Sequence, residues 1–337
     1  MGAMIRRLHV RVAVLTACAL GLGGCGAQST LDPHAGPAHD IATLWWWMLA
    51  VAGTVLGGAL FLLLLGYLRR RKPGLPLLGE REGPATALVI AFGVAIPLAV
   101  NVSLFVVANF FVAKATEAPD ARTTPLTIQV IGHQWWWEVR YPGTTAVTAN
   151  EIHIPVGTRV NVVASTADVI HSFWVPQLNR KIDMIPGHPN RVLLQADRTG
   201  RYRGQCAEFC GSQHAHMAMY VFADPPDRFR SWLSRMSAPR VAPTSAEAQR
   251  GEQVFDAQAC ASCHQIRGTS AQGRIGPDLT HVGSRSTLAA LTIPNRPGYL
   301  AGWILDPQHV KPGNRMPGLN LSNQDFRAVL SYVEGLR

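Results

Sequence analysis

The 337-residue sequence lacks the features that mark several large classes of protein. It has no internal repeat, which excludes solenoids and propellers built from repeated units. Its net charge of +10 is not gathered into a basic stripe, and no nucleic-acid-binding motif accompanies it, so nucleic acid is not an expected partner. Only six cysteines are present, and the roles predicted for them below leave no pair for a disulfide.

Charge is absent from two long segments, which we predict to be membrane-spanning helices. The segments are residues 41–68 and 84–113, and uncharged runs of 28 and 30 residues are long enough to cross a bilayer with some tilt. The loop 69–83 between them is rich in arginine and lysine, whereas the flank before the first segment carries only Asp32 and Asp40. Because positively charged loops stay in the cytoplasm, the sequence predicts a two-helix hairpin with both chain ends outside.

Residues 1–24 have the pattern of a lipoprotein-type signal peptide. Three arginines precede an apolar stretch from Val12 to Leu22, which is the order of a positive n-region and a short h-region. Leu22-Gly-Gly-Cys25 is similar to a bacterial lipobox, so Cys25 is expected to become the lipidated first residue of the mature chain. An uncleaved segment with an unmodified Cys25 is the alternative.

From residue 125 to residue 236 the sequence consists of short stretches rich in β-branched residues, separated by turns that contain proline and glycine. The expected strands are Leu126–Ile131, Val160–Ser165, Arg191–Leu194 and Met219–Phe222. Several short strands separated by such turns predict an antiparallel sandwich. An alanine- and proline-rich linker, 237–245, then leads to a last domain over 246–337.

Soft metal ligands are concentrated between residues 206 and 217. Cys206 and Cys210 lie four residues apart, His214 follows four residues later, and Met217 comes three beyond that. Thiolate, thioether and imidazole donors together select copper or zinc over hard cations. Zinc sites use cysteine, histidine and carboxylate, so the thioether favours copper. A structural zinc site with Met217 in the core is the alternative.

One further imidazole is needed for this site, and His171 is the best candidate. It lies 35 residues upstream of Cys206, in the segment His171-Ser-Phe-Trp174. In cupredoxin-like sandwiches one ligand comes from an early strand and the others from a late loop, which matches this spacing. His216 is expected to point away from His214 and not to be a ligand.

Cys260-Ala-Ser-Cys263-His264 predicts the covalent attachment of a c-type haem. The two cysteines would form thioethers with the haem vinyl groups, and His264 would be the proximal ligand. Met316 is the only methionine after this motif and is the expected sixth ligand, with His281 and His309 as competitors.

Two helical stretches enclose this motif in the sequence. They cover Ala246–Ala257 and Asn323–Gly335, at the two ends of the last domain. Terminal helices that cross around a haem are the arrangement expected of a small, all-α cytochrome c domain.

The pattern C-x-E-x-C-x-x-x-H-x-x-M, with H-S-F upstream, closely resembles the dinuclear CuA site of cytochrome c oxidase subunit II. The resemblance implies that Cys206 and Cys210 bridge two copper ions, that His171 and His214 each cap one, and that Met217 is a weak axial ligand. It also implies that the Glu208 backbone carbonyl completes the copper site. In the family the carboxylate of this glutamate binds a magnesium ion shared with subunit I.

Further segments carry the same resemblance. Gly132-His-Gln-Trp135-Trp136-Trp137 is similar to the family's aromatic stretch, whose first tryptophan, here Trp135, lies over CuA and receives the electrons; we expect Trp136 and Trp137 to pack in the core. Lys181-Ile-Asp183-Met-Ile-Pro-Gly187 is similar to the loop that packs against the catalytic subunit. The fused cytochrome makes the chain similar to bacterial caa-type oxidases.

The expected protein is thus a multidomain membrane protein: a two-helix transmembrane hairpin, an all-β cupredoxin-like sandwich and an all-α cytochrome c domain. The resemblance implies a bacterial inner-membrane oxidase subunit with CuA and haem c on the periplasmic side. Its expected partners are subunit I, subunit III, the lipid bilayer, and cytochrome c or a cytochrome bc complex as donor. A nitric oxide reductase subunit and a free-standing electron carrier are the alternative functions.

Overall fold

The computed structural model describes residues 26, 28–70, 82–120, 122 and 124–337. The expected signal peptide, 1–24, and the lipidation site Cys25 lie outside the described residues, as does most of the expected cytoplasmic loop. These expectations therefore stay predictions.

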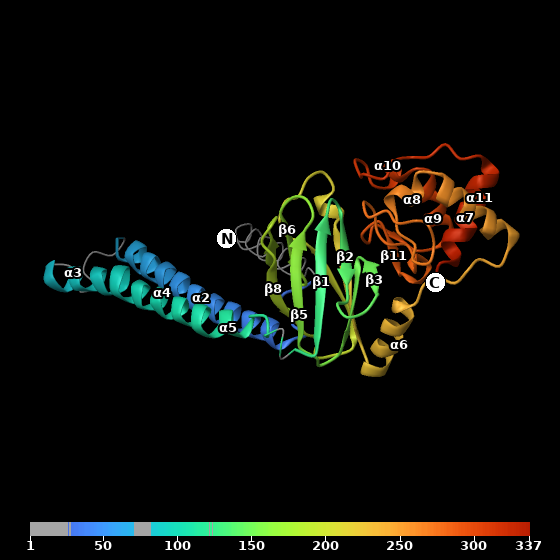
Figure 1. Ribbon diagram of the computed structural model, residues 1–337. Helices are drawn as coiled ribbons and strands as arrows, with labels where there is room; N and C mark the ends of the chain where they lie inside the picture. The colour runs from blue at the N-terminus through green and yellow to red at the C-terminus, as the bar shows by residue number, and fades with distance from the viewer. Residues whose placement is uncertain (1–25, 27, 71–81, 121, 123) are drawn as a thin grey trace, which may run out of the picture.

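Two long apolar helical segments lie side by side and project as an arm from one side of a β-sandwich (Figure 1). The first is α2, Gly36–Arg70, which begins before the expected Ile41. The second is continuous along the chain and alternates between α- and π-helical geometry: α3 Glu82–Ile90, η1 Ala91–Ala95, α4 Ile96–Val106, η2 Val107–Val112 and α5 Ala113–Ala115. Their mean hydropathies of 2.4 and 2.3 and their lengths suit a membrane span.

The sandwich consists of two five-stranded sheets that face each other. The first sheet has the order β3-β2-β1-β5-β8 and contains β1 Leu126–His133, β2 Trp136–Arg140, β3 Val147–Ala149, β5 Val160–Thr166 and β8 Asn190–Leu194. The second has the order β4-β10-β9-β6-β7 and contains β4 Glu151–Pro155, β6 His171–Trp174, β7 Ile182–Met184, β9 Gly200–Cys206 and β10 Ala218–Asp224. Alternate residues of these strands, such as Ile128 and Val130 on β1, are fully buried between the sheets.

The expectation of a purely antiparallel sandwich was wrong. β1 pairs in parallel with β5, and β4 pairs in parallel with β10. The chain crosses to the other sheet at β4 before it returns as β5, so β1 and β5 are not joined by a hairpin. Only a hairpin connection forces neighbouring strands to run in opposite directions, and turn signals in the sequence do not reveal such a crossover.

A helical domain follows the sandwich. Helix α6, Pro226–Ser237, packs against the sandwich, and the next helices are α7 Ala246–Ala257, α8 Cys260–Cys263, α9 Pro297–Leu305, α10 Pro307–Val310 and α11 Asn323–Gly335. Helices α7 and α11 have the bounds expected from the sequence and cross at Gly251. A Cβ there would lie 2.0 Å from the Ala328 carbonyl oxygen, so only glycine permits this approach of the two backbones.

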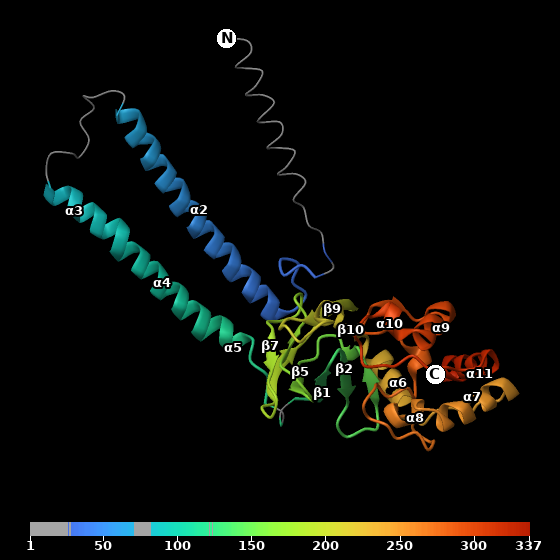
Figure 2. The same ribbon diagram turned by 90° about the horizontal axis from the view of Figure 1, so that it is seen from above.

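The helical domain lies against the sandwich on the side away from the membrane arm, as both views show (Figures 1 and 2). Hydrogen bonds connect the two domains directly. The Ser286 backbone N–H donates to the Glu151 carboxylate over 2.7 Å, and Arg267 donates to the Thr145 carbonyl over 2.6 Å. The helical domain is thus seated directly on the sandwich.

Candidate functional site

The predicted copper ligands come from two neighbouring strands and one loop. Cys206 ends β9 and His171 begins β6, and these strands pair antiparallel, with Phe173 opposite Cys206. The other predicted ligands lie in the loop from β9 to β10, which contains the short 3-10 helix η3, His214–His216. Strand pairing therefore brings together two parts of the chain that are distant in sequence.

The ligand atoms form one compact cluster around the two thiols. The Sγ atoms of Cys206 and Cys210 are 3.8 Å apart, and both cysteines are free. An imidazole nitrogen lies beside each sulfur: His171 Nδ1 is 3.8 Å from Cys206 Sγ, and His214 Nδ1 is 3.6 Å from Cys210 Sγ. This cluster has the donor chemistry of a soft-metal site.

Two further predicted donors complete the cluster. Met217 is fully buried, with its Sδ atom 3.8 Å from Cys210 Sγ. The Glu208 carbonyl oxygen is 3.2 Å from Cys206 Sγ. A donor set of two thiols, a thioether, two imidazoles and a carbonyl fits copper, and its thioether argues against an ordinary zinc site.

His171 is oriented by a carboxylate behind it. Its Nε2 atom is 2.8 Å from Asp168 Oδ1, which leaves Nδ1 directed at Cys206. Burial opposes the ionisation of Asp168, but the bond with His171 and the backbone N–H groups of Gln134 and Val169 outweigh it, so its pKa falls to about 2. Burial likewise lowers the pKa of His171, but its bonds with Asp168 and Cys206 raise the pKa overall.

Because the two thiols lie close together, their pKa values shift in opposite directions before a metal binds. The bond from Cys210 lowers the pKa of Cys206 to about 3 against the effect of burial. The same interaction, together with burial, raises the pKa of Cys210. A thiolate is the form that binds metal, so the lowered pKa of Cys206 favours metal binding, whereas binding at Cys210 must displace a proton whose pKa is raised.

The remaining polar groups of the loop face away from the cluster. His216 is exposed, and its Nδ1 atom is 2.7 Å from Gln213 Oε1, which agrees with its expected orientation. The Glu208 carboxylate instead lies 3.6 Å from Lys181 Nζ, which is also 3.5 Å from Asp183. The backbone carbonyl of Glu208 therefore contacts the sulfur cluster, whereas its side-chain carboxylate lies beside Lys181.

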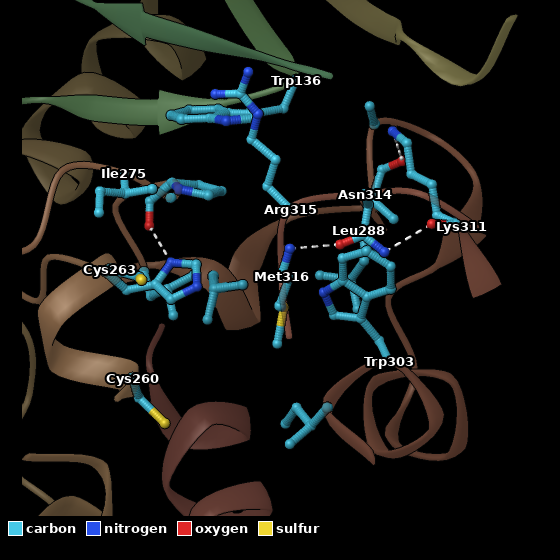
Figure 3. A pocket seen from close by; sticks show the side chains of 18 of the residues that line it. Trp136, Cys260, Cys263, Ile275, Leu288, Trp303, Lys311, Asn314, Arg315 and Met316 are labelled. Carbon is cyan, nitrogen blue, oxygen red and sulfur yellow. Dashed lines mark hydrogen bonds between the residues drawn. The ribbon is translucent and has the colours of Figure 1, made fainter. Parts of the chain in front are cut away.

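A largely apolar cavity lies in the helical domain and is bordered on one side by Trp135 and Trp136 of the sandwich. Its walls include Leu288, Leu300, Trp303, Ile304 and Val329, together with the predicted haem residues Cys260, Cys263, His264 and Met316. Figure 3 shows the Met316 side chain extending into the cavity, with Cys260 and Cys263 at one side. The structure thus gathers all four residues that the sequence assigned to haem c.

The histidine in this cavity is prepared to bind a metal. His264 Nδ1 lies 2.8 Å from the Pro277 carbonyl oxygen and donates to it, which leaves Nε2 available. Burial lowers the pKa of His264, which favours the neutral imidazole that a metal requires. The backbone of Gly276 packs closely against the imidazole ring of His264, because a Cβ at this position would lie only 2.5 Å from His264 Cε1.

One buried arginine and the two competing histidines lie at different positions relative to this cavity. Arg285 lines the cavity, is buried, and has an Nε atom without a partner among the described residues, which fits an anionic edge of a haem. His281 does not line the cavity, and its Nε2 atom is 2.9 Å from the Ala238 carbonyl oxygen. His309 is exposed and is also absent from the cavity wall. The geometry therefore favours Met316 as the sixth ligand.

Trp135 connects the cavity to the cysteine cluster. Its indole Nε1 donates to the Cys210 carbonyl oxygen over 3.0 Å, and the residue also lines the cavity. Trp137 is fully buried in the sandwich core, as expected. The core position expected for Trp136 was wrong: this residue stacks on His133 at a ring separation of 4.2 Å and lines the cavity (Figure 3). The alternation of side chains along β2 directs Trp136 and Trp137 to opposite faces.

Several residues of this region were not found from the sequence. Asp168, Gln134, Arg285 and Lys311 all contact the site or line the cavity. Asp168 was within reach of sequence reasoning, because a carboxylate three residues before a predicted histidine ligand is a common orienting group. The others act through contacts with distant segments, which no local pattern indicates.

Replacing Asp168 with asparagine should weaken metal retention without removing a ligand. The amide keeps the size of the side chain but loses the charge that holds His171 in place, so we expect copper affinity to fall roughly 10- to 100-fold. Competition with a chelator at fixed pH measures this change. Asp227→Asn, on exposed α6, is the control and should leave affinity unchanged; equal affinities in both variants would contradict an orienting role.

Comparisons with known proteins cover both parts of the chain. The family described as cytochrome c oxidase subunit II, periplasmic domain, matches residues 144–223, and the cytochrome c family matches residues 248–337. Cytochrome c oxidase subunit 2 of Alkalihalophilus pseudofirmus is 35% identical over 327 residues, which cover 96% of this chain and 94% of that protein. The subunit 2 of Bacillus subtilis is 29% identical over 354 residues, covering 98% of each chain.

A solved structure gives a local likeness. The periplasmic domain of subunit II of the cytochrome oxidase of Bradyrhizobium japonicum is 32% identical, with a TM-score of 0.33, and the match covers 34% of this chain and 98% of that one. The near full-length relative, together with the two apolar helices, decides the family. The chain belongs to the cytochrome c oxidase subunit 2 family, as a membrane-anchored subunit II of a haem-copper oxidase with a C-terminal cytochrome c domain.

Proposed function

We propose that this subunit receives electrons on a haem c in its last domain, passes them to a dinuclear copper centre in the sandwich, and delivers them to catalytic subunit I, where oxygen is reduced to water. The observation that carries the proposal is the position of Trp135. This residue lines the cytochrome cavity and is hydrogen-bonded to Cys210 within the sulfur cluster. The two candidate redox sites therefore adjoin each other within one chain.

The residues of the cluster would hold the copper pair in a fixed geometry. Cys206, Cys210, His171 and His214 would be its main ligands, and Met217 and the Glu208 carbonyl would be weaker ones. When bound, the copper pair and the haem supply reversible one-electron redox chemistry. Cys206, Cys210, His171 and Met217 are all buried, so packing restrains their movement when the charge of the site changes.

The cytochrome cavity would hold its haem through four residues. Cys260 and Cys263 would form the thioether links, and His264 and Met316 would bind the iron. A histidine and methionine pair raises the potential of a haem, which suits a carrier that feeds a terminal oxidase. Donor recognition, by a cytochrome c or a cytochrome bc complex, would then use the outer surface of the cytochrome domain, since the face over Trp135 is already covered.

The opposite side of the sandwich would face subunit I. The segment that leads to Lys181 is joined to the end of the membrane arm, because Asn179 Nδ2 donates to the Thr116 carbonyl over 3.4 Å and Arg180 Nε donates to the Thr116 hydroxyl over 3.1 Å. Lys181 and the Glu208 carboxylate, which lie 3.6 Å apart, would then face subunit I, and this carboxylate would bind a magnesium ion shared with it. The sandwich and cytochrome domains would be periplasmic, and subunit III would be a further partner.

The order of reduction tests the proposed function. In the intact oxidase, mixed rapidly with a reduced donor, the haem c absorption should change before the copper absorption. Metal analysis should give two copper ions and one covalent haem in each chain. Copper that is reduced by the donor while haem c stays oxidised would contradict the proposed order.

Replacing Trp135 with phenylalanine should slow the reduction of copper by haem c while copper content and fold remain intact. Phenylalanine keeps an aromatic ring but loses the indole N–H that donates to the Cys210 carbonyl. Rapid mixing with absorption detection measures the rate. Trp232→Phe, on α6, is the matched control and should transfer at the normal rate; an unchanged rate in the Trp135 variant would make Trp135 a packing residue.

A further inference from the structure

Lys311 occupies an unusual position between the cytochrome domain and the copper loop. Its side chain is buried, with 3% of the residue exposed. The ammonium donates to three backbone carbonyls: Trp135 over 2.9 Å, His216 over 2.8 Å and Ala289 over 3.2 Å. Two of these acceptors belong to the sandwich domain and one to the cytochrome domain, so one side chain binds both domains.

The chemistry of these contacts suits a lysine. An ammonium has three N–H donors, which matches three carbonyl acceptors. The hydrogen-bond partners of the Lys311 ammonium are these three carbonyls. Burial lowers the pKa of Lys311 to about 7, which reflects the cost of withdrawing the group from water. The carbonyls of Trp135 and His216 offset that cost only when the domains are docked.

The segment that begins at Lys311 also contacts the copper loop along its length. Gln213 Nε2 donates to the Pro312 carbonyl over 2.5 Å, and a Cβ on Gly313 would lie 3.2 Å from Ser212 Oγ. Arg315 donates to the side chain of Gln134, and Gln134 in turn donates to the Cys210 carbonyl over 2.9 Å. The loop 311–316, which ends in the candidate haem ligand, therefore packs directly on the loop 206–217.

We propose that Lys311 is a positioning residue that fixes the methionine loop of the cytochrome domain against the copper loop, and so sets the separation of the two redox sites. The inference deepens the proposed function and rests on it. Electron transfer between the sites requires a short and constant separation, and a domain joined only by the linker 237–245 would sample many separations. Ser286 and Arg267 hold the cytochrome domain on the sandwich elsewhere, and Lys311 fixes its methionine loop at the copper loop.

The test uses the intact oxidase with three variants. Lys311→Met removes all donors but keeps nearly the length of the side chain, Lys311→Gln keeps an amide with two donors, and Arg327→Gln removes an exposed charge on α11 of the same domain as the control. Because hydrogen bonds to a charged group are strong, the methionine variant should weaken docking roughly tenfold or more, and glutamine should restore part of it.

Two measurements, hydrogen–deuterium exchange and the rate of electron transfer, are made on each variant. Hydrogen–deuterium exchange should rise in segments 211–216 and 311–316 of the methionine variant and stay normal in α7 and α11. Laser-triggered transfer from haem c to copper should slow by more than the change in driving force accounts for, with the potentials of both sites measured in each variant because Lys311 also lines the haem cavity. Normal exchange at both segments, or a normal transfer rate despite increased exchange, would overturn the proposal.

The exchange measurement also separates this inference from the proposed function. If the chain held no copper or no haem, the proposed function would fail, but the exchange comparison would still report whether Lys311 holds the domains together. If both groups are bound and transfer is normal in the methionine variant, the proposed function stands and Lys311 has no positioning role.

Discussion

A chain in which Cys210 is replaced by serine should contain no dinuclear copper centre. Cys210 Sγ lies 3.8 Å from Cys206 Sγ, 3.6 Å from His214 Nδ1 and 3.8 Å from Met217 Sδ, so it contacts three other donors of the cluster. A serine hydroxyl is a hard, neutral donor that cannot replace a bridging thiolate. The purple mixed-valence absorption and the electron shared between two ions, seen by paramagnetic resonance, should both disappear.

The neighbouring residue His216 provides the matched control for this variant. Its side chain is exposed and bonded to Gln213, so His216→Ala should keep two copper ions and the normal spectrum. Cys210 is a buried member of the sandwich core, but the variant should still fold because serine is nearly the same size as cysteine. A single bound zinc in the unmodified protein, or an intact mixed-valence spectrum in the serine variant, would contradict the assignment.

Replacing Met316 with alanine should give an oxidase with covalent haem but almost no turnover with its natural donor. Cys260 and Cys263 are unaffected, so the haem should stay attached. Loss of the thioether should lower the haem potential and open the sixth position to small ligands. Oxygen consumption with the natural donor should fall by a large factor, whereas an artificial reductant of the copper centre should still drive it.

His309 supplies the control for the Met316 variant. It lies in the same part of the cytochrome domain but is exposed and does not line the cavity, so His309→Ala should keep the spectrum and the turnover. Full turnover in Met316→Ala, or in a chain truncated at Pro239, would show that the haem is an accessory and not a relay.

The sequence by itself determined the features that depend on short stretches of chain. The cysteine, histidine and methionine spacing of 206–217 lies within one loop, and its donors meet in the structure. The two apolar runs, helices α7 and α11, and the haem motif are equally local. Hydrophobic run length, capping serines and ligand spacing act over a few residues, so a linear pattern is sufficient to reveal them.

Only the tertiary structure decided how these parts meet. The parallel pairing of β1 with β5, the stacking of Trp136 at the cavity, and the contact of Asp168 with His171 depend on the path of the whole chain. The carbonyls that receive Lys311 lie 176 and 95 residues before it, and backbone oxygens are chemically alike at every position. Such contacts arise from the packing of complete domains, so nothing in the local sequence distinguishes the residues that make them.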